Sequence, residues 1–273
     1  MSRTKVSKNL LAHSFGQCQL RYTSVTRVTL VPCDGDKITI QGKNYSIPAA
    51  GVYNNHSTSA TNYRNGVGSS SLIAATEYYV SVFNNAGTLT LCFWDKATGH
   101  STDTTAGNEG VEIITGHPDH TLVGWVRTDG SGQFIFTNVY IWVRTWFNDN
   151  GAAGFASLGV DTGLSQNTWT AFSVVSILCW NRETCGVYSN ASIYDSVTSA
   201  SGYVGLYLNS ALQNAYGLFT TAGAGYWSNA GAMISFRNTG DYLYVLNGGM
   251  YTSGANSVLF SNSHIAFFTA GRM

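Results

Sequence analysis

Two histidines and an aspartate gather in one short stretch of the chain, His117-Pro118-Asp119-His120. Imidazole and carboxylate groups this close together can bind a transition metal or move a proton. The two histidines are three positions apart, however, and lack the helical spacing of a metalloprotease site. Because strand-like segments flank the stretch, we interpret it as a solvated turn between strands rather than as a metal site.

A second polar pair, Asp34 and Asp36, offers two carboxylates to a cation, but the later ligands of a calcium-binding loop are missing. A turn between strands is the favoured interpretation. The cysteines form an odd set without a C-x-x-C pair, which argues against a zinc site or a disulfide framework; they are Cys18, Cys33, Cys92, Cys179 and Cys185. We expect most of them to be reduced and buried, although Cys179 and Cys185 could close a small loop.

Hydrolysis of a glycan requires two carboxylates in one cleft, one as acid and the other as base or nucleophile. Residues 151–273 hold four carboxylates, Asp161, Glu183, Asp195 and Asp241. None belongs to a recognisable motif and each lies beside a predicted turn. The chain also lacks a nucleophile elbow, a P-loop and a glycine motif for dinucleotides. We therefore expect a protein that is not an enzyme and that holds no cofactor and no metal.

Aromatic side chains suggest a different chemistry, because their rings stack on the apolar faces of sugars while amides bind the hydroxyls. The candidates near predicted turns or strand ends are Tyr188, Tyr194, Tyr203, Tyr207, Tyr216, Trp227 and Tyr251. The preferred site is the small-residue segment Ala224–Asn229, where Tyr226, Trp227 and Asn229 lie together, with Tyr203 and Tyr251 as further ligand-binding candidates. For any single ring, packing in a core or an interface is the competing interpretation.

The amino-acid composition argues against nucleic acid and the membrane interior as partners of this chain. Charged residues make up only 10% of the chain and hydrophobic residues 44%, and 14 basic side chains balance 14 acidic ones. Without a basic stripe to neutralise phosphates, nucleic acid is not expected as a partner. No window approaches the roughly 18 apolar residues that a membrane helix needs, so no membrane insertion is expected. The apolar run near the start, Leu10–Ala12, is too short for the core of an export signal.

Abundant Val, Ile, Thr and aromatic residues with three prolines favour an all-β fold of antiparallel sandwich or jelly-roll type. In the first half, strands are predicted at Arg27–Val31, Lys37–Gln41, Glu77–Phe83, Thr88–Trp94, Thr121–Val126, Gln133–Thr137 and Val139–Phe147. In the second half they are predicted at Trp169–Trp180, Gly186–Tyr194, Tyr203–Leu208, Met233–Phe236, Asp241–Leu246, Ser257–Phe260 and His264–Phe268. The clearest hairpin turns at Asn84–Gly87, and a second is predicted to turn at Thr128–Gly132.

The chain changes character near residue 150, because residues 151–273 carry seven of the 28 charged side chains and no lysine. The small polar segment Asn148–Gly154 is typical of a domain boundary. We predict an N-terminal arm at 1–16, which docks on a neighbouring subunit or is a frayed end, a β-sandwich at 17–150 and a distal β-sandwich or jelly roll at 151–273. Residues 52–71 are predicted to form a long polar loop that carries contacts or is disordered.

Four segments of the first half carry a resemblance to a known kind of protein. They are Tyr78–Trp94, with its Val82–Leu91 core, then Gly110–Gly116, then Leu122–Thr128, and a closing aromatic strand through Trp142. In this order they resemble a β-rich domain that recurs in tail-tip, fibre and head-spike proteins of tailed bacteriophages and phage-like particles. The resemblance covers roughly residues 17–148. It implies a virion structural protein, with residues 17–150 as the virion-attachment domain, and carries over no functional residues.

The second half loosely resembles the distal jelly-roll heads of trimeric fibres, which implies a homotrimer. We therefore expect a virion protein, assembled in the bacterial host cytoplasm together with other virion proteins. Its distal domain is expected to bind a host cell-surface polysaccharide. The alternatives are a decoration or tail-wall subunit that only stabilises the particle and, less favoured, a fibre-borne glycan depolymerase.

Overall fold

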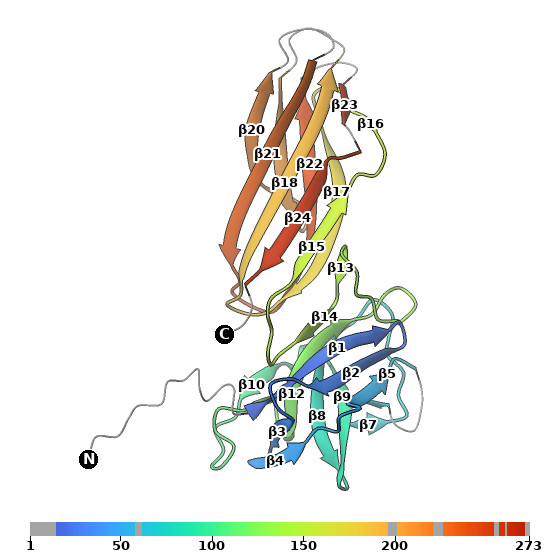
Figure 1. Ribbon diagram of the computed structural model, residues 1–273, viewed down its shortest axis with the longest axis vertical. Helices are drawn as coiled ribbons and strands as arrows, with labels where there is room; N and C mark the ends of the chain where they lie inside the picture. Colours follow the sequence, from blue (N-terminus) through green and yellow to red (C-terminus); the bar gives the residue numbers. More distant parts are fainter. Residues whose placement is uncertain are drawn as a thin grey trace, which may run out of the picture. The chain divides into compact units, whose positions relative to one another are not determined.

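The computed structural model describes residues 15–57, 62–195, 201–220, 226–253, 257–259 and 261–270, and of residues 195, 214–220, 226 and 227 only the backbone. This part of the chain consists of β-strands and one short 3-10 turn, η1 (Lys96–Thr98), so the predicted all-β fold is confirmed (Figure 1). The chain divides into two compact units. Unit 1 takes the described residues up to Phe136 and Trp142–Asn150, and unit 2 takes Thr137–Ile141 and Gly151–Ala270.

The last passage from unit 1 to unit 2 lies between Asn150 and Gly151, within the predicted junction. The predicted continuous strand over Val139–Phe147 is wrong, because two short strands separated by Trp142 replace it. The first, β13 (Tyr140–Ile141), pairs in parallel with β17 of unit 2, whereas the second, β14 (Val143–Thr145), pairs with β12 of unit 1. The apolar run Val139–Phe147 thus contributes one strand to each unit.

Unit 1 is a sandwich of two sheets. The first sheet has the order β1 (Cys18–Ser24), β2 (Arg27–Pro32), β5 (Val52–Asn55). The second has the order β10 (His100–Thr102), β11 (Glu112–Ile114), β12 (His117–Arg127), β8 (Glu77–Asn85), β9 (Thr88–Asp95), β6 (Tyr63–Arg64), β7 (Val67–Gly68), with β14 on β12. A hairpin of β3 (Lys37–Ile40) and β4 (Lys43–Ser46) adds to it. The three short strands β5, β6 and β7 lie within the predicted loop 52–71, which is therefore partly ordered sheet; residues 58–61 lie outside the described residues.

The core of unit 1 is filled from both sheets. Alternate residues of β8, Tyr78, Val80 and Val82, are fully buried against apolar side chains of β1 and β2. The predicted turn after β8 is confirmed, since Asn85 pairs with Thr88. The predicted hairpin between β12 and Gln133–Thr137 is reduced to one isolated bridge. Burial of Phe134 in the core and two hydrogen bonds of 2.8 Å to the Asp129 carboxylate hold that segment as a compact turn.

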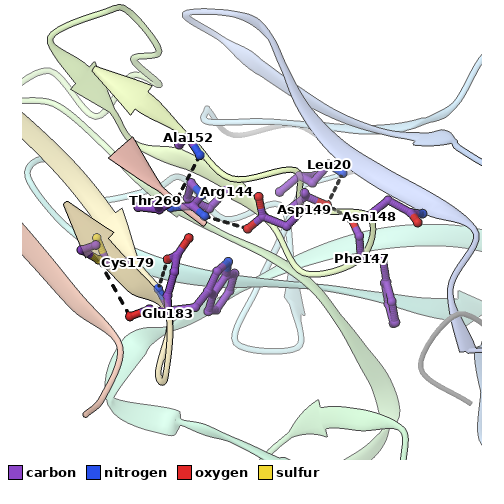
Figure 2. A network of polar contacts seen from close by, with 12 residues as sticks. Leu20, Arg144, Phe147, Asn148, Asp149, Ala152, Cys179, Glu183 and Thr269 are labelled. Carbon is purple, nitrogen blue, oxygen red and sulfur yellow. Dashed lines mark hydrogen bonds and ion pairs between the residues drawn. The ribbon is translucent and has the colours of Figure 1, made fainter. Parts of the chain in front are cut away.

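The end of unit 1 is tied to its first strands by side-chain hydrogen bonds, some of which are drawn in Figure 2. The amide of Asn148 donates to the carbonyl groups of Cys18 and Cys33, and the main-chain N–H of Leu20 donates to the Thr145 hydroxyl at 3.0 Å. Arg144 and Asp149 form an ion pair in the same segment. The last residues before the junction are therefore ordered parts of unit 1.

Unit 2 is one long hairpin folded into two sheets. Its nested antiparallel pairs, from the ends inward, are β15 (Ala153–Ser157) with β24 (His264–Thr269), β17 (Thr168–Cys179) with β22 (Tyr242–Thr252), β18 (Thr184–Asp195) with β21 (Tyr226–Arg237), and β19 (Ser201–Leu208) with β20 (Ala211–Thr220). One sheet has the order β13-β17-β22-β19-β20, and the other contains β15, β24, β18 and β21. Two short strands, β16 (Thr162–Gly163) and β23 (Ser257–Leu259), extend the second sheet. Eight strands nested in this way form a jelly roll (Figure 1).

The core of unit 2 lies between these two sheets. Phe172 and Ile177 of the first sheet meet Val187 and Phe267 of the second in one buried cluster. Because side chains alternate along each strand, the remaining positions point outward on two separate faces. The chemistry of unit 2 therefore depends on what these two outer faces carry.

Candidate ligand-binding face

Three aromatic side chains form a row across the outer face of the β13-β17-β22-β19-β20 sheet. Trp169 of β17 pairs with Tyr251 of β22, which pairs in turn with Tyr203 of β19. The ring centroids of Trp169 and Tyr251 are 5.8 Å apart, and those of Tyr251 and Tyr203 are 6.1 Å apart. Tyr203 is 43% exposed. The fourth ring, Tyr207, meets Trp169 edge to face at 6.1 Å. We call these four residues the aromatic platform.

The platform lies on two glycines that are directly paired, Gly205 and Gly249. A Cβ atom on Gly249 would come within 2.3 Å of Tyr207 Cε2, and one on Gly205 would come within 2.9 Å of Trp169 Cζ3. The rings therefore occupy the space that side chains would fill at these positions. A ring that covers a glycine on one side turns its other side away from the sheet, where a ligand can reach it.

Polar but uncharged groups surround the platform. The Tyr251 hydroxyl donates to Asn167 Oδ1 at 3.2 Å, which fixes the edge of that ring. Asn247 of β22 pairs with Tyr207 and shares its outward face. Partial burial raises the pKa of the Tyr207 hydroxyl, so it stays protonated at neutral pH and remains a donor. The platform can therefore stack on an apolar face and hydrogen-bond to hydroxyls, with no fixed charge of its own.

The structure separates the five ligand-binding candidates predicted from the sequence. It brings Tyr203 and Tyr251 together in the platform. Tyr226, Trp227 and Asn229 lie on β21, which belongs to the other sheet. These three positions form a strand paired with β18 and not a loop of small residues, because the alternating residues of β18 offer a full antiparallel ladder. Asn229 accepts a hydrogen bond from Ser192 at 2.6 Å, and the side chains of Tyr226 and Trp227 lie outside the described residues.

Sequence reasoning missed Trp169, which it treated only as the first residue of a strand. Positions 170 and 168 share the face of the buried Phe172, so Trp169 between them lies on the opposite, outward face. A bulge at Ser173, where φ is +50°, shifts the alternation farther along β17 and hides this pattern. The approach of Trp169 to Tyr251 depends on cross-strand register, which periodicity does not give.

Part of the outer face of the second sheet of unit 2 is apolar, beside His264, whose ring centroid lies 5.2 Å from that of Phe155 and 6.0 Å from that of Tyr188. Phe155, Tyr188 and Met233 lie in one row across β15, β24, β18 and β21, and Phe268 lies in the next row. Phe155 is 48% exposed, Phe268 53% and Met233 65%. The Phe268 ring covers Gly186, since a Cβ there would be 2.1 Å from Phe268 Cζ. We call these four side chains the apolar face. Exposed hydrophobic groups gathered in this way are typical of contact surfaces between proteins.

The histidine stretch predicted to be a solvated turn is instead the start of β12, and His120 is buried. Its Nδ1 lies 2.9 Å from the Ser81 hydroxyl, which also accepts a hydrogen bond of 3.0 Å from Trp94 Nε1. Asp119 lies 3.9 Å from the other ring nitrogen of His120. These residue types could form a nucleophile and its base, but the fully buried Ser81 gives no substrate access to its hydroxyl. The group is a hydrogen-bonded part of the sheet.

The carboxylates of unit 2 whose side chains are described serve as acceptors for main-chain N–H groups. Asp161 accepts from Ser261 at 2.8 Å, Glu183 from Trp180 at 2.9 Å, and Asp241 from Asn181 at 2.6 Å. The side chain of Asp195 lies outside the described residues. Within the described ranges, no three His, Cys, Asp or Glu side chains are arranged to hold a metal ion, and no helix is long and apolar enough to cross a membrane.

All five cysteines are free thiols, including Cys179 and Cys185, which do not close a loop. Four are buried and Cys33 is partly buried. Burial raises the pKa of the Cys92 thiol to about 12 and raises that of Cys18 as well. These thiols pack in strands as small apolar side chains.

No protein-family model matches the sequence, and no curated protein matches it significantly. Among solved structures, the chain is similar to a chain in the structure of infectious bursal disease virus, Gt strain. The identity is 14% and the TM-score 0.35, over 94% of this chain and 73% of that one. It is similar to the VP2 subviral particle of that virus at 11% identity and a TM-score of 0.35, over 74% and 54% of the two chains. It is also similar to Eiger TNF from S. frugiperda at 10% identity and a TM-score of 0.30, over 45% and 95%. Two of these are viral particle proteins, but likeness at this level carries no argument about activity or partner, and the resemblance to tailed-phage proteins over residues 17–148 stays a prediction.

Proposed function

We propose that this chain is a structural protein of a phage-like particle, a fibre, spike or tail-tip component, whose jelly roll binds a neutral host-surface carbohydrate through the aromatic platform. One observation carries the proposal: Trp169, Tyr203 and Tyr251 are aligned across three neighbouring strands, and two of the platform rings lie on a floor of paired glycines. Neighbouring rings in this row are tilted to one another by 49° and 47°, and together they offer an apolar surface across three strands. Pyranose rings present matching apolar faces.

The surroundings of the platform favour an uncharged ligand. Asn167 and Asn247 supply amides, Tyr207 supplies a hydroxyl, and no charged residue belongs to the platform. A charged sugar would lose hydration on this surface without gaining a counter-ion. The carbohydrate is therefore expected to be a neutral stretch of a cell-surface polysaccharide.

The test is binding of the fluorescently labelled full-length protein to a panel of intact Gram-negative and Gram-positive cells, before and after enzymatic removal of surface polysaccharide. We expect saturable binding that is lost on stripping and weakened about tenfold by Trp169→Ala or Tyr203→Ala. The matched control is Tyr242→Ala, because Tyr242 lies on the same strand as Tyr251, outside the platform, and is 46% exposed where Tyr203 is 43% exposed. Equal weakening by the control, or binding that survives stripping, would overturn the proposal.

The apolar face suggests how copies of the chain assemble. Phe155, Met233 and Phe268 would remain in water in an isolated chain, and burying them between copies removes that cost. We propose that this face forms the contact in a homotrimer, the closed symmetry of fibre-like components. Light scattering after size-exclusion chromatography should give three times the chain mass. The double variant Phe155→Ser with Phe268→Ser should give the monomer, and Leu212→Ser on the other sheet should not.

The rival function is a decoration or tail-wall subunit that only stabilises the particle. The exposed Leu212 and Val174 beside the platform favour it, because a neighbouring virion protein could cover them. An assembled protein that binds no cell in the panel would support this rival. Release of oligosaccharides from polysaccharide by the purified protein would instead support a depolymerase.

A further inference from the structure

Unit 1 contains a cleft between the β4–β5 connection and the hairpin of β8 and β9. The cleft has a volume of about 460 Å³ and is lined by ten residues, none of which is charged. Val52 and Leu89 lie among its apolar lining, and Tyr45 and Tyr53 present rings to it. Ser46, Thr88 and Thr90 add hydroxyl groups. Ligand sites for small molecules have this size and this mixture of apolar surface with a few polar groups.

The two tyrosine rings are held by neighbours outside the cleft. The Arg27 guanidinium lies 4.2 Å from the centroid of the Tyr53 ring, and Arg27 Nε donates to Asn55 Oδ1 at 3.4 Å. Arg27 thus supports the ring while its charge stays outside the lining. On the other side, the Asn84 amide donates to the Tyr45 hydroxyl at 3.3 Å. Both rings therefore have a preferred orientation before a ligand arrives.

The hairpin that forms the other wall is also fixed. Asn84 Oδ1 accepts a hydrogen bond of 2.9 Å from the Gly87 N–H, which closes the turn between β8 and β9. Thr88 and Thr90 follow this turn on β9. Hydroxyl groups on a fixed strand can bind the hydroxyls of a ligand at defined positions without the entropy cost of ordering a loop.

We propose that this cleft binds a neutral sugar unit of one or two rings. The tyrosine rings stack on its apolar faces, and the threonine and serine hydroxyls bind its hydroxyl groups. No charged side chain lines the cleft, which favours a neutral ligand, and the two cations nearest to it, Lys37 and Arg27, are each engaged with a lining residue, Ser46 and Tyr53. The proposal does not rest on the aromatic platform, since every residue that carries it belongs to unit 1. Unit 1 is then a second carbohydrate contact and more than an anchor.

The experiment is saturation-transfer-difference NMR of the full-length protein with glucose, galactose, mannose, N-acetylglucosamine and maltose as separate probes. We expect at least one probe to bind saturably, and Tyr53→Ala to weaken it about tenfold. Thr90→Val, which keeps the shape and removes the hydroxyl, should weaken it about threefold. Tyr53 is 49% exposed on an edge strand, so its removal should leave the thermal unfolding midpoint nearly unchanged.

The control is Tyr203→Ala, which removes a platform ring in unit 2: sugar signal that it removes belongs to the platform, and the signal that remains should be the part that Tyr53→Ala removes. The proposal is overturned when none of the five probes binds, or when binding is insensitive to Tyr53→Ala. It is also overturned if Tyr53→Ala abolishes attachment to another virion protein while no sugar binds, because the cleft is then a peptide site. Loss of sugar signals on Tyr203→Ala alone would place all sugar binding on the platform.

Discussion

Arg144 Nη2 donates a hydrogen bond of 2.7 Å to Asp149 Oδ2, and both side chains are only 3% exposed (Figure 2). Removing one partner takes a close counter-charge away from the other in a dry environment. Asp149→Ala is therefore expected to lower the free energy of unfolding by about 3–5 kcal/mol. Urea denaturation followed by tryptophan fluorescence measures it.

The control for this prediction is Asp36→Asn, which breaks the exposed pair of Asp36 with Lys37. Such a pair is worth little in water, so the change should stay within about 0.5 kcal/mol. A loss near 1 kcal/mol or less for Asp149→Ala would show that the Arg144 charge does not depend on Asp149 for its stabilisation.

The pH dependence of stability should show the titration of His120. Burial lowers the pKa of His120 to about 4, with a smaller lowering from His117 and an opposing effect of Asp119. The unfolded chain therefore binds a proton near pH 6.5 that the folded chain refuses until about pH 4. Stability from this group is fully present above pH 6.5 and is lost as the pH falls toward 4, by about 3 kcal/mol in total.

The test compares the free energy of unfolding at pH 4.5 and pH 7 for the wild type and for His120→Gln, which does not titrate. Carboxylates also make the free energy of unfolding depend on pH in this range. The quantity to compare is therefore the change in unfolding free energy from pH 7 to pH 4.5 in the wild type and in the variant. The wild type should lose more stability than the variant on acidification. Equal losses would mean that His120 is protonated in the folded state.

The sequence was sufficient for features that depend on local periodicity. Alternation along Tyr78–Phe83 and the Asn84–Gly87 turn predict a hairpin, and the structure has it. Charge distribution predicts a junction near Asn150, whereas the chain passes between the units after Phe136, after Ile141 and after Asn150. Such features follow from side-chain direction and turn chemistry within a few residues.

Features that depend on distant partners were beyond the sequence. The stretch starting at His117 has the composition of a polar turn, but pairing of β12 with β8 and β11 makes it a strand and buries His120. Tyr203 and Tyr251 are 48 positions apart and meet only because β22 lies between β17 and β19. Sheet order is a global property, so the sequence identified Tyr203, Tyr207 and Tyr251 as candidate rings but neither Trp169 nor the grouping of the four.

Thiol chemistry should separate Cys33 from the other four cysteines. Cys33 is partly buried, whereas Cys18, Cys92, Cys179 and Cys185 are buried free thiols. Burial raises the pKa of Cys92 to about 12, so its reactive thiolate is scarce at pH 8. Ellman's reagent at pH 8 should react rapidly with one thiol in the native protein and with five in denaturant. If only three thiols react in denaturant without a reductant, two cysteines form a disulfide. Cys33→Ser should abolish the rapid reaction of the native protein.

The paired glycines beneath the aromatic platform should be intolerant of even one methyl group. A Cβ on Gly249 would lie 2.3 Å from Tyr207 Cε2 and 3.4 Å from Trp169 Cε3, so Gly249→Ala must displace the Tyr207 ring. We expect a loss of about 1–3 kcal/mol in unfolding free energy, because the methyl group and the Tyr207 ring compete for one space. The binding to cells that depends on surface polysaccharide should also weaken, because the displaced ring no longer has its place in the platform.

Gly163→Ala is the matched control, since a Cβ on Gly163 of β16 meets nothing within 4 Å. It should leave both the unfolding free energy and cell binding unchanged. If Gly249→Ala binds cells as the wild type does while losing stability, the rings of the platform are packing groups only. If it loses binding at nearly unchanged stability, the position of Tyr207 and Trp169 is itself what the ligand requires.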